Sequence, residues 1–404
     1  MPRLAVVTSH PIQYQAPWFR ALANELDLVV FFAHRQDAEG QAAAGFGHAF
    51  DWDVPLLDGY RFEWLQNEST APSVDTFSGC DTPDIEDRLR AGGFDACLVN
   101  GWYLKSYLQA LRACRRLGLP VLMRGDSHLK TRRHPMIALG KHLPYRWLLG
   151  RVAAHLYVGE ANRRYLRHYG VRPERLFFAP HFVDNGRFAR AAERARASGE
   201  AAALRHRIGA DPATRICLFA GKLIEKKRPD DFVDAIARLE HRGAPILGAM
   251  VGSGPLAEAL AERVVARGAR ISLLGFRNQT EIPACYAAAD CLVLPSDGRE
   301  TWGLVVNEAM ACGVPVVVSD AVGCGEDLVD AMTGAIYPVG QVGALADRLQ
   351  WLVGRLDREG PRIRQAVLDK ISAYSCGEAV VGTNRALAFV LEGRRAHAPQ
   401  EVSG

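Results

Sequence analysis

The chain has 404 residues, of which 49% are hydrophobic and 23% charged, and its formal net charge is +4. This length corresponds to two or three domains, and the composition excludes a largely disordered chain. The nine cysteines include no Cys-x-x-Cys pair, which favours reduced thiols in the cytoplasm over a disulfide framework. No apolar run approaches the ~18 residues of a membrane span, and the first residues are expected to form a strand rather than a signal peptide.

The charge is unevenly distributed along the chain. Residues 1–100 carry 6 Lys and Arg against 15 Asp and Glu, whereas residues 101–200 carry 20 against 6. The block 127–159 has basic, aromatic and leucine side chains but no acidic one. This block predicts an anionic acceptor or an anionic membrane surface as a partner. A second interpretation stays equally open, in which it is an arginine-rich helix whose apolar side is core.

Apolar runs alternate with helical patterns in the first half of the chain. Strands are expected over residues 4–8, 28–33, 96–100, 121–124 and 154–158, and a helix over residues 103–117. Gly118 and Pro120 supply the signals that end this helix. Such alternation predicts a parallel sheet with helices on both faces.

Two strand ends and one loop of the first half carry polar side chains that suit a site. His10 follows the first strand, where a His-Pro pair can also simply cap the strand exit, and Asp126 follows the strand at 121–124. The Asp51-Trp52-Asp53 loop places two carboxylates two residues apart, an Asp-x-Asp pattern that can hold a metal ion. Because this loop lies in an acidic stretch, we expect it to be a surface turn, away from the candidate phosphate-binding lysines of the second half that are described below.

Residues 187–212 are rich in Ala and Arg and contain no strand-like run, which predicts a helical connector. The second half then repeats the alternation, with strands expected over 216–220, 246–251, 271–275, 291–294 and 314–319 and helices over 229–242, 255–267 and 303–312. The expected organisation is a first domain over residues 1–186, the connector over 187–212 and a second domain over 213–375. Residues 376–404 form a last helix that can pack back on the first domain, with a frayed tail.

The strand end at Gly221 is rich in lysine. Three of the seven lysines of the chain lie within this short segment, among them Lys222 and Lys227. Lysine is a compact positive charge that can approach a phosphate group, and each contact at ~4 Å contributes ~4 kcal/mol at an effective dielectric of ~20. The alternative interpretation is a solvated loop.

Two further strand ends carry weaker signals. Gly252-Ser253-Gly254 is close to the dinucleotide fingerprint, which would suit a nicotinamide-dependent oxidoreductase, but the next strand ends without the required acidic residue. A tight turn is the better interpretation. Phe276 and Arg277 follow that next strand, where backbone groups can hydrogen-bond a nucleotide base.

The strongest signal is a pair of glutamates around a helix start. Glu300 lies in a loop, and Glu308 lies about 7–8 Å along the following helix from Gly303. The N–H groups of Gly303 and Leu304 fall between the two carboxylates. This layout suits a ligand that has hydroxyl-bearing sugars at both ends and a diphosphate in the middle. A pair of surface charges is the bland alternative, but the rest of the helix is apolar.

These segments resemble the retaining glycosyltransferases of family 4. Glu300 and Glu308 are similar to the family's Glu-x7-Glu motif, and Lys222 and Lys227 resemble its basic phosphate-binding pair, with Lys222 where an arginine is commoner. The resemblance covers residues ~215–345 and implies the GT-B fold, an α/β architecture of two Rossmann-like doubly wound domains that face each other across a cleft. The first domain would then bind the acceptor and the second the nucleotide-sugar donor.

The resemblance also implies the chemistry. A sugar would pass from a nucleotide-diphosphate sugar to a hydroxyl-bearing glycan or lipid-linked acceptor with retention and without a covalent enzyme intermediate. The implied setting is cell-surface polysaccharide or glycolipid synthesis, in the cytoplasm or peripherally at the inner face of the membrane. We expect no cofactor, no essential metal and no nucleic acid partner. A catalytically inactive nucleotide-sugar binder remains an alternative, because Asp126 stands where many members have a histidine.

The site residues expected on this basis fall into two groups. The catalytic group is His10, Asp126 and Glu300. The donor-binding group is Gly221, Lys222, Lys227, Gly252, Phe276, Arg277, Glu300, Gly303, Leu304 and Glu308.

Overall fold

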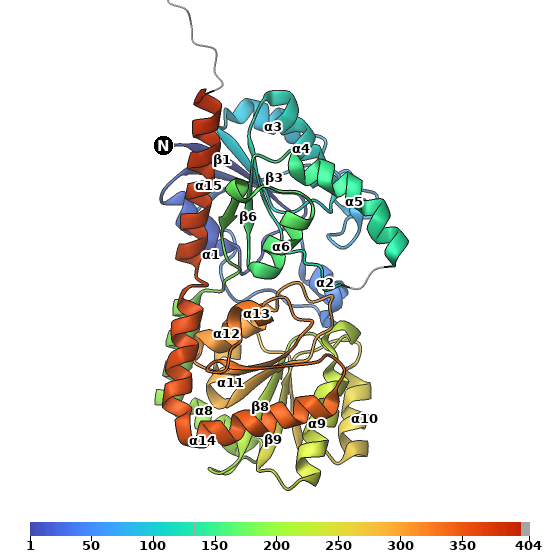
Figure 1. Cartoon of the computed structure of the whole chain (residues 1–404), viewed down its shortest axis with the longest axis vertical. Coiled ribbons are helices and arrows are strands. Elements are labelled where there is room, and N and C mark those ends of the chain that lie inside the picture. Colours follow the sequence, from blue (N-terminus) through green and yellow to red (C-terminus); the bar gives the residue numbers. More distant parts are fainter. Residues whose placement is uncertain (132–133, 397–404) are drawn as a thin grey trace, which may run out of the picture.

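The computed structural model describes residues 1–131 and 134–396 and contains two parallel sheets, one in each half of the chain (Figure 1). The two doubly wound domains predicted from the alternating pattern are therefore confirmed. The first sheet has seven strands, in the spatial order β3 (Arg61–Trp64), β2 (Asp27–Phe32), β1 (Arg3–Thr8), β4 (Ala96–Val99), β5 (Val121–Arg124), β6 (Ala154–Tyr157) and β7 (Leu176–Phe178). The second has six, in the order β10 (Ile271–Gly275), β9 (Ile246–Val251), β8 (Arg215–Ala220), β11 (Cys291–Leu294), β12 (Val316–Ser319) and β13 (Gly334–Tyr337).

Helices cover both faces of each sheet. Those of the first domain are α1 (Ala16–Ala23), α2 (Ala38–Gln41), α3 (Ile85–Gly92), α4 (Lys105–Leu117), α5 (Pro135–Gly150) and α6 (Glu160–His168). The remaining helices are α7 (Asn185–Ala197), α8 (Glu200–Arg207), α9 (Pro229–His241), α10 (Ala257–Arg267), α11 (Ile282–Ala288), α12 (Leu304–Ala311), α13 (Gly325–Leu328), α14 (Val342–Ser372) and α15 (Cys376–Ala396). Short 3-10 or π turns cover Ala42–Phe46, Phe77–Gly79, Pro173–Arg175 and Glu225–Lys227.

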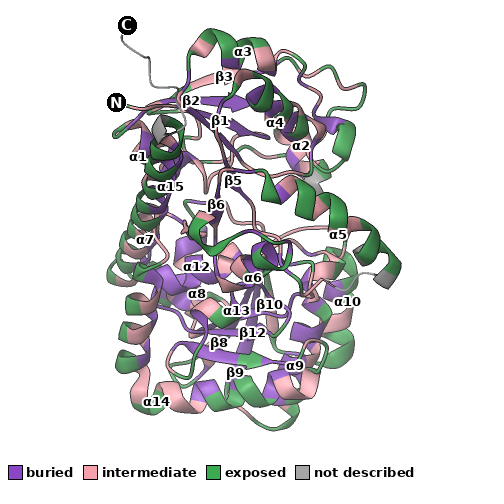
Figure 2. Cartoon of the chain, turned by 45° about the horizontal axis from the view of Figure 1, so that its top comes forward, coloured by how far each residue is buried: buried purple, intermediate pink, exposed green. Residues whose placement is uncertain are grey.

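Local sequence signals explain several of these boundaries. The α4 helix ends at Gly118, whose φ of 64° is easily reached only by glycine, and its N–H bonds the carbonyl groups of Cys114 and Arg115. Pro229 opens α9, where its missing N–H has no helical partner to lose. The central strands β1 and β8 are apolar runs buried on both faces, as parallel sheets require (Figure 2).

The chain crosses between the domains twice. Residues of the predicted connector form α7 and α8, which pack against α11 and α12 of the second domain. After α14 the chain returns, and α15 runs along the first domain (Figure 1). Its side chains Ala379, Ala386 and Leu387 are buried in the same core as α1 and β1. The predicted tail from about residue 394 lies mostly at 397–404, outside the described residues.

The two domains touch through the loops at the carboxyl ends of their strands. After β5, Thr131 donates to the Gly298 carbonyl oxygen at 2.5 Å, and Lys130 donates to the Val322 carbonyl oxygen at 2.8 Å. These contacts leave the loops of both domains facing one another across a narrow cleft. Within the described part of the chain, every helix is too short or too polar to cross a bilayer.

Candidate functional site

A cavity of about 520 Å³ lies between the two domains, at the carboxyl ends of the strands. Its size falls within the range typical of small-molecule sites. It brings together eight of the predicted site residues: His10, Gly221, Lys222, Lys227, Gly252, Phe276, Arg277 and Glu308. Asp126, Glu300, Gly303 and Leu304 do not line it, but a chain of contacts links Asp126 and Glu300 to it, as described below.

Two backbone loops form one wall of the cavity. Gly252 has a φ of 146°, and a side chain there would place its Cβ only 1.8 Å from the Gly221 carbonyl oxygen. Gly252 therefore allows the loop after β9 to lie directly against the loop after β8. This close approach gives the Gly-Ser-Gly segment a packing role, in agreement with its interpretation as a tight turn.

The Lys227 ammonium makes a buried ion pair with Glu300. The Nζ–Oε2 distance is 2.5 Å and each side chain is 11% exposed. Burial by itself would raise the pKa of Glu300, but the charges of Lys227 and Lys226 and the hydrogen bonds from Lys227 and Ser296 more than offset it, and the net pKa is lowered. Glu300 is thus an anion held directly behind a cation that faces the cavity.

Lys222 faces the cavity from the same loop, and its Nζ lies 4.4 Å from the centre of the Phe46 ring. Burial, followed by the nearby charge of Lys226, lowers the pKa of Lys222. Three lysines of one short segment therefore concentrate positive charge at one end of the cavity. An anionic ligand there would relieve their mutual repulsion.

The Asp51-Trp52-Asp53 loop does not lie where the sequence suggested. Trp52 lines the same cavity as Lys222 and Lys227. The loop is fixed to the second domain because Asn278 donates to the Asp51 carbonyl oxygen at 2.8 Å and Thr280 donates to the Asp53 carboxylate. The prediction of a surface turn away from the phosphate-binding residues was therefore wrong.

Aromatic packing explains this position. The rings of Phe46, His48 and Phe50 lie 5.7, 4.7 and 4.4 Å from the ring of Phe276, measured between centroids. Trp52 packs edge-on against Phe50 at 4.9 Å. Residues 46–53, which we call the aromatic loop, thereby carry first-domain side chains onto a predicted donor-binding residue of the second domain.

Glu308 is 1% exposed and accepts three hydrogen bonds from uncharged donors. The Tyr286 hydroxyl donates to Oε2 at 2.6 Å, while the Tyr14 hydroxyl and the Gln279 amide donate to Oε1 at 3.0 and 3.4 Å. Burial is the largest influence and raises the pKa of Glu308, although these donors oppose the rise. A carboxylate has about four acceptor positions, so about one remains for a ligand hydroxyl.

The start of α12 separates the two glutamates. Gly303 has a φ of 100°, and a Cβ there would lie 2.7 Å from the Leu294 side chain, so glycine is required at this turn. Within residues 1–131 and 134–396, no acceptor bonds the N–H of Gly303 or Leu304. The N–H groups at this helix start thus have no partner in the described chain, and Val305 of the first turn lines the cavity.

Asp126 belongs to a polar cluster that joins the two domains. Its Oδ2 accepts from the Thr301 hydroxyl at 2.7 Å and lies 3.6 Å from His181 Nε2. His181 Nδ1 lies 3.3 Å from an Arg124 nitrogen. Burial opposes ionisation, but the hydrogen bonds and charges of these neighbours hold the pKa of Asp126 below its usual range. Since Thr301 adjoins Glu300, this carboxylate is connected to the lysine end of the site.

His10 lines the cavity beside the lysines, and its Nδ1 lies 3.0 Å from the Ser9 hydroxyl. Burial, together with the charges of His34 and Lys222, lowers the pKa of His10 to about 4. The imidazole is therefore neutral near pH 7 and can accept or donate one hydrogen bond. The position of His10 in the cavity agrees with the prediction that it lies in the cleft, whether or not it also caps the end of the first strand.

The sequence did not identify the partners of the two carboxylates. Tyr14 lies 294 residues from Glu308 along the chain, and His181 lies 55 residues from Asp126. Both follow strands at their carboxyl ends, which is the signal that could have found them. In the described ranges, no group of three or more His, Cys, Asp or Glu side chains is arranged to hold a metal ion.

Comparison with known proteins agrees with this geometry. Residues 201–357 match the model of the group 1 glycosyl transferases. The D-inositol 3-phosphate glycosyltransferase of Streptomyces bingchenggensis is 34% identical over 184 residues, which are 43% of this chain and 39% of that protein. The chain therefore spans well under two thirds of that relative's length.

Solved structures are similar over almost the whole chain. The alpha,alpha-trehalose 6-phosphate synthase of Burkholderia multivorans has a TM-score of 0.74 at 15% identity, with 98% of both chains covered. Anabaena HepE in complex with UDP has a TM-score of 0.68 at 16% identity, with 97% of this chain and 100% of that chain covered. These likenesses confirm the predicted GT-B fold.

Proposed function

We propose that this chain, a GT-B protein whose second half matches the group 1 glycosyl transferases, transfers a sugar from a nucleotide-diphosphate sugar to an acceptor hydroxyl. One observation carries the proposal. The interdomain cavity is lined by Lys222, Lys227 and the buried Glu308, and Glu300 is paired with Lys227. Positive charge for the diphosphate, together with carboxylates that can accept from sugar hydroxyls, suits such a donor.

The lysine end would hold the diphosphate. Lys222 and Lys227 line the cavity, and so does Val305 in the first turn of α12. As the sugar leaves, negative charge grows on the diphosphate, so the two ammonium groups bind the transition state more strongly than the donor. When Lys227 contacts the phosphate, the Glu300 carboxylate gains free acceptor positions for hydroxyls of the transferred sugar.

Glu308 would accept from the ribose. The carboxylate lines the cavity and is held in place by Tyr286 and Gln279 of its own domain. The base would then lie toward Phe276 and Arg277, against the aromatic loop. UDP is the nucleotide bound by the similar Anabaena HepE, and we propose a uridine or similar nucleotide here.

The acceptor would enter between the domains and meet Asp126 and His10. Asp126 is 42% exposed in its side chain and anionic, so it can accept a hydrogen bond from an acceptor hydroxyl or from the transferred sugar. We propose transfer with retention, in which a diphosphate oxygen takes the acceptor proton on the face from which the diphosphate departs. Because lysines and helix N–H groups neutralise the diphosphate, we propose that no protein-bound metal and no cofactor are needed.

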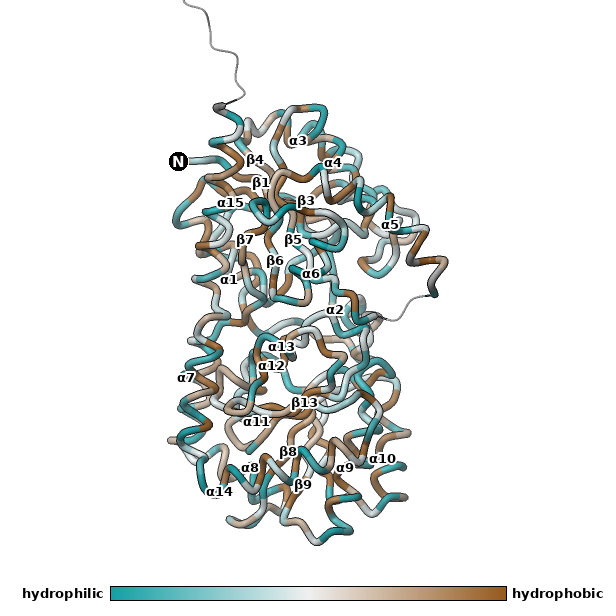
Figure 3. The backbone as a smooth tube through the Cα atoms, viewed as in Figure 1, coloured by the Kyte–Doolittle hydropathy of each residue, from teal (hydrophilic) through white to brown (hydrophobic). Residues whose placement is uncertain are grey.

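The α5 helix supports a membrane-associated acceptor. Met136, Leu139, Leu143 and Trp147 follow one another at helical spacing and are 54% to 77% exposed. Lys141 and Arg146 belong to the same helix, and Arg151 follows its last residue. Figures 2 and 3 show that α5 is largely exposed and has both hydrophobic and hydrophilic segments. The basic block therefore carries an apolar face that is not core, which favours the membrane interpretation over the core interpretation; Arg132 and Arg133 of the block lie outside the described residues. Since the loop before α5 contacts the second domain at the cleft, a lipid-linked or glycan acceptor held at a bilayer would be close to the site.

Nucleotide release with a panel of UDP-, GDP- and ADP-sugars tests the enzymatic proposal. Glu308→Gln is expected to weaken nucleotide affinity about ten- to hundredfold, because it removes a charged acceptor. Asp357→Asn, at an exposed carboxylate paired with Arg215 on the far side of the domain, is the matched control. Nucleotide binding without turnover by any donor would instead favour an inactive nucleotide-sugar binder.

Vesicle flotation tests the membrane proposal separately. The wild-type chain is expected to float with phosphatidylglycerol vesicles and not with neutral ones. The Leu139→Ser/Leu143→Ser variant is expected to remain unbound in the dense fraction with both. Val265→Ser, at an apolar side chain that is 82% exposed on α10, is the control and should float like the wild type. Equal flotation of the stripe variant would count against α5 as the docking helix.

A further inference from the structure

A second cavity, of about 700 Å³, lies in the first domain at the end of the sheet that faces away from the cleft. It is bounded by the C-terminal half of α4, the start of β5 and the end of α5. Most of the side chains that line it are apolar: Leu108, Leu111, Leu119, Pro120, Val121, Trp147, Leu148, Val152 and Ala153. A cavity of this size is within the range of ligand sites and is not explained by the proposed transfer reaction.

Three arginines complete its lining, namely Arg112 and Arg115 of α4 and Arg151 at the end of α5. In the part of the chain that the structure describes, none of the three has a carboxylate within 4 Å, and all three are exposed. The neighbouring Arg116 behaves differently, because it pairs with Glu86 at 2.7 Å. The cavity thus combines an apolar interior with positive charge that no acidic side chain neutralises.

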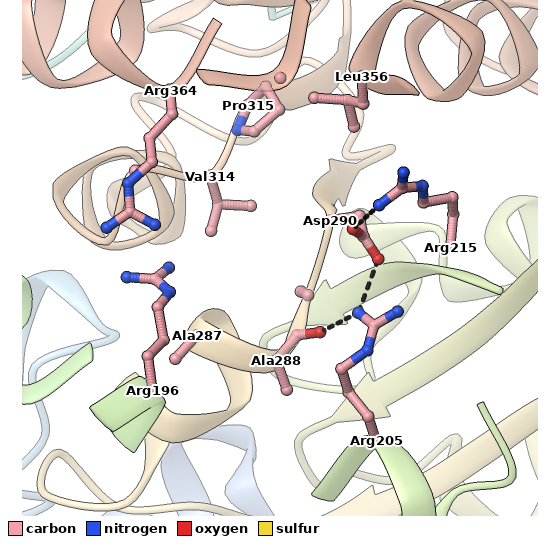
Figure 4. A pocket seen from close by; sticks show the side chains of 13 residues that line it. Arg196, Arg205, Arg215, Ala287, Ala288, Asp290, Val314, Pro315, Leu356 and Arg364 are labelled. Atoms are coloured by element: carbon pink, nitrogen blue, oxygen red, sulfur yellow. Dashed lines mark hydrogen bonds and ion pairs between the residues drawn. The ribbon is translucent and has the colours of Figure 1, made fainter. Parts of the chain in front are cut away.

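An arginine-lined cavity in the second domain shows the contrast (Figure 4). There, the Asp290 carboxylate forms ion pairs with Arg205 and Arg215, at 2.8 and 3.0 Å. The Glu193 carboxylate likewise lies within 4 Å of Arg196 and Arg364. Carboxylates of the chain itself neutralise the charges of those arginines, which therefore have a structural role. At the α4–α5 cavity, Arg151 donates to the Trp147 carbonyl oxygen at 3.4 Å, but no described carboxylate lies within 4 Å of any of the three arginines.

We propose that the α4–α5 cavity binds one anionic membrane phospholipid, with an acyl chain among the leucines and the phosphate at Arg112, Arg115 and Arg151. Charge complementarity selects the anion, and the apolar lining selects the chain. The inference rests on the membrane part of the proposed function for the source of the lipid, and it adds a ligand class and a site.

The position of α5 connects the cavity with the bilayer. Trp147 belongs both to the exposed stripe of α5 and to the cavity lining. The Arg151 guanidinium lies 4.1 Å from the centre of the Trp147 ring, so cation and aromatic ring stand together at the cavity. A lipid at the bilayer surface beneath α5 could thus place one chain in the cavity without leaving the interface.

Calorimetric titration with dodecyl phosphate below its critical micelle concentration tests this site. We expect saturable binding of one molecule per chain, and an affinity reduced about ten- to hundredfold in the Arg112→Ala/Arg115→Ala variant. Arg116→Ala, on the same helix, is the matched control and should bind like the wild type. Dodecyl maltoside supplies the chain without the charge, and inorganic phosphate supplies the charge without the chain; both should bind at least about tenfold more weakly.

The outcomes separate the proposals. Equal binding of dodecyl maltoside, or an unchanged affinity in the double arginine variant, would overturn the site. The Leu139→Ser/Leu143→Ser variant should still bind dodecyl phosphate even if it no longer floats with vesicles, because its substitutions lie outside the cavity. Neither readout involves sugar transfer, so failure of the enzymatic proposal would be seen in nucleotide release alone.

Discussion

The two glutamates of the cleft are eight residues apart and have opposite environments. Glu300 is paired with the Lys227 ammonium, and its pKa is lowered. Glu308 is surrounded by two tyrosine hydroxyls and an amide, and its pKa is raised. A glutamate is thus stabilised as an anion at one end of the cavity. At the other end, burial makes the ionised form of a glutamate less favourable.

This difference indicates what each end can do. At the Glu300 end, the cation that stabilises the carboxylate also faces the cavity, so an anionic ligand competes for it. At the Glu308 end, no cationic side chain of the described residues is within hydrogen-bond distance, and any further hydroxyl donor would stabilise the ionised carboxylate. The first end suits charge that changes during a reaction, and the second suits a constant part of the ligand.

Lys227→Met is expected to have the largest effect, because it leaves Glu300 buried without its cation. Removal of one partner of a buried pair lowers the free energy of unfolding by about 3–5 kcal/mol. Nucleotide release should fall about ten- to hundredfold or more, since a phosphate contact is lost too. Urea unfolding and the release assay measure the two effects. Lys370→Met, at an exposed pair with Asp330, is the control.

The double variant Lys227→Met/Glu300→Leu sharpens this test. Replacement of both partners of a buried pair by apolar side chains is often close to neutral for stability. We therefore expect the double variant to unfold near the wild-type urea midpoint while nucleotide release stays low. Recovered turnover in the double variant would show that the pair is structural and lies outside the reaction.

Glu308→Gln should separate stability from binding in the opposite way. The raised pKa means that the ionised Glu308 destabilises the folded chain, so a neutral side chain of the same shape removes that penalty. Without added nucleotide, we expect a melting temperature at pH 7 equal to or above that of the wild type, beside the weakened nucleotide affinity. A clearly lower melting temperature would contradict the assigned environment.

The sequence predicted the central strands of both sheets well, because strands that are buried on both faces of a parallel sheet consist of continuous apolar residues. It missed β3, β7 and β13, which are edge strands or short segments: β3 alternates polar and apolar residues, and β7 has only three residues. Strands β7 (Leu-Phe-Phe) and β13 (Gly-Ala-Ile-Tyr) are apolar but only three and four residues long, so neither gives a run long enough to be distinguished from a loop.

The site was predictable where its residues follow one another along the chain. Lys222, Lys227, Glu300 and Glu308 could be found because each follows a strand of one sheet. The contact between Tyr14 and Glu308 joins two domains, and no local pattern encodes it. The position of the Asp51-Trp52-Asp53 loop was predicted wrongly for the same reason, since the aromatic loop that contains it packs against Phe276.

The pH dependence of stability should differ in sign between the two ends. Glu300 has a lowered pKa, so its stabilisation is present above the ordinary value of 4.5 and is lost as the pH falls through the lowered pKa. Glu308 has a raised pKa, so its contribution is most favourable below 4.5 and declines as the pH rises through the raised pKa.

Urea midpoints of the wild type, Glu300→Gln and Glu308→Gln between pH 3 and pH 8 measure these contributions. The deficit of Glu300→Gln should be largest at pH 7 and shrink toward pH 3. Any advantage of Glu308→Gln should likewise grow toward pH 7. Parallel curves for all three proteins would show that neither carboxylate has a shifted pKa.

Tyr14→Phe is expected to have the smallest effect, and its sign is informative. Of the three hydroxyl and amide donors to Glu308 in the described chain, the Tyr14 hydroxyl comes from the first domain. While it donates, about one acceptor position of the carboxylate remains, whereas the two adjacent hydroxyls of a ribose need two. Loss of this hydroxyl should therefore strengthen nucleotide binding by up to about tenfold, which corresponds to a hydrogen bond of about 0.5–1.5 kcal/mol.

Tyr286→Phe is the matched control, because it removes a donor from the same domain as Glu308 and leaves the Tyr14 contact in place. Its nucleotide affinity should fall, since the carboxylate loses the 2.6 Å bond that orients it. Equal changes in the two variants, measured by titration with UDP and GDP, would mean that the hydroxyls merely fill space. Opposite changes would mean that the first domain competes with the nucleotide for Glu308, so that closure of the cleft and binding of the ribose share one carboxylate.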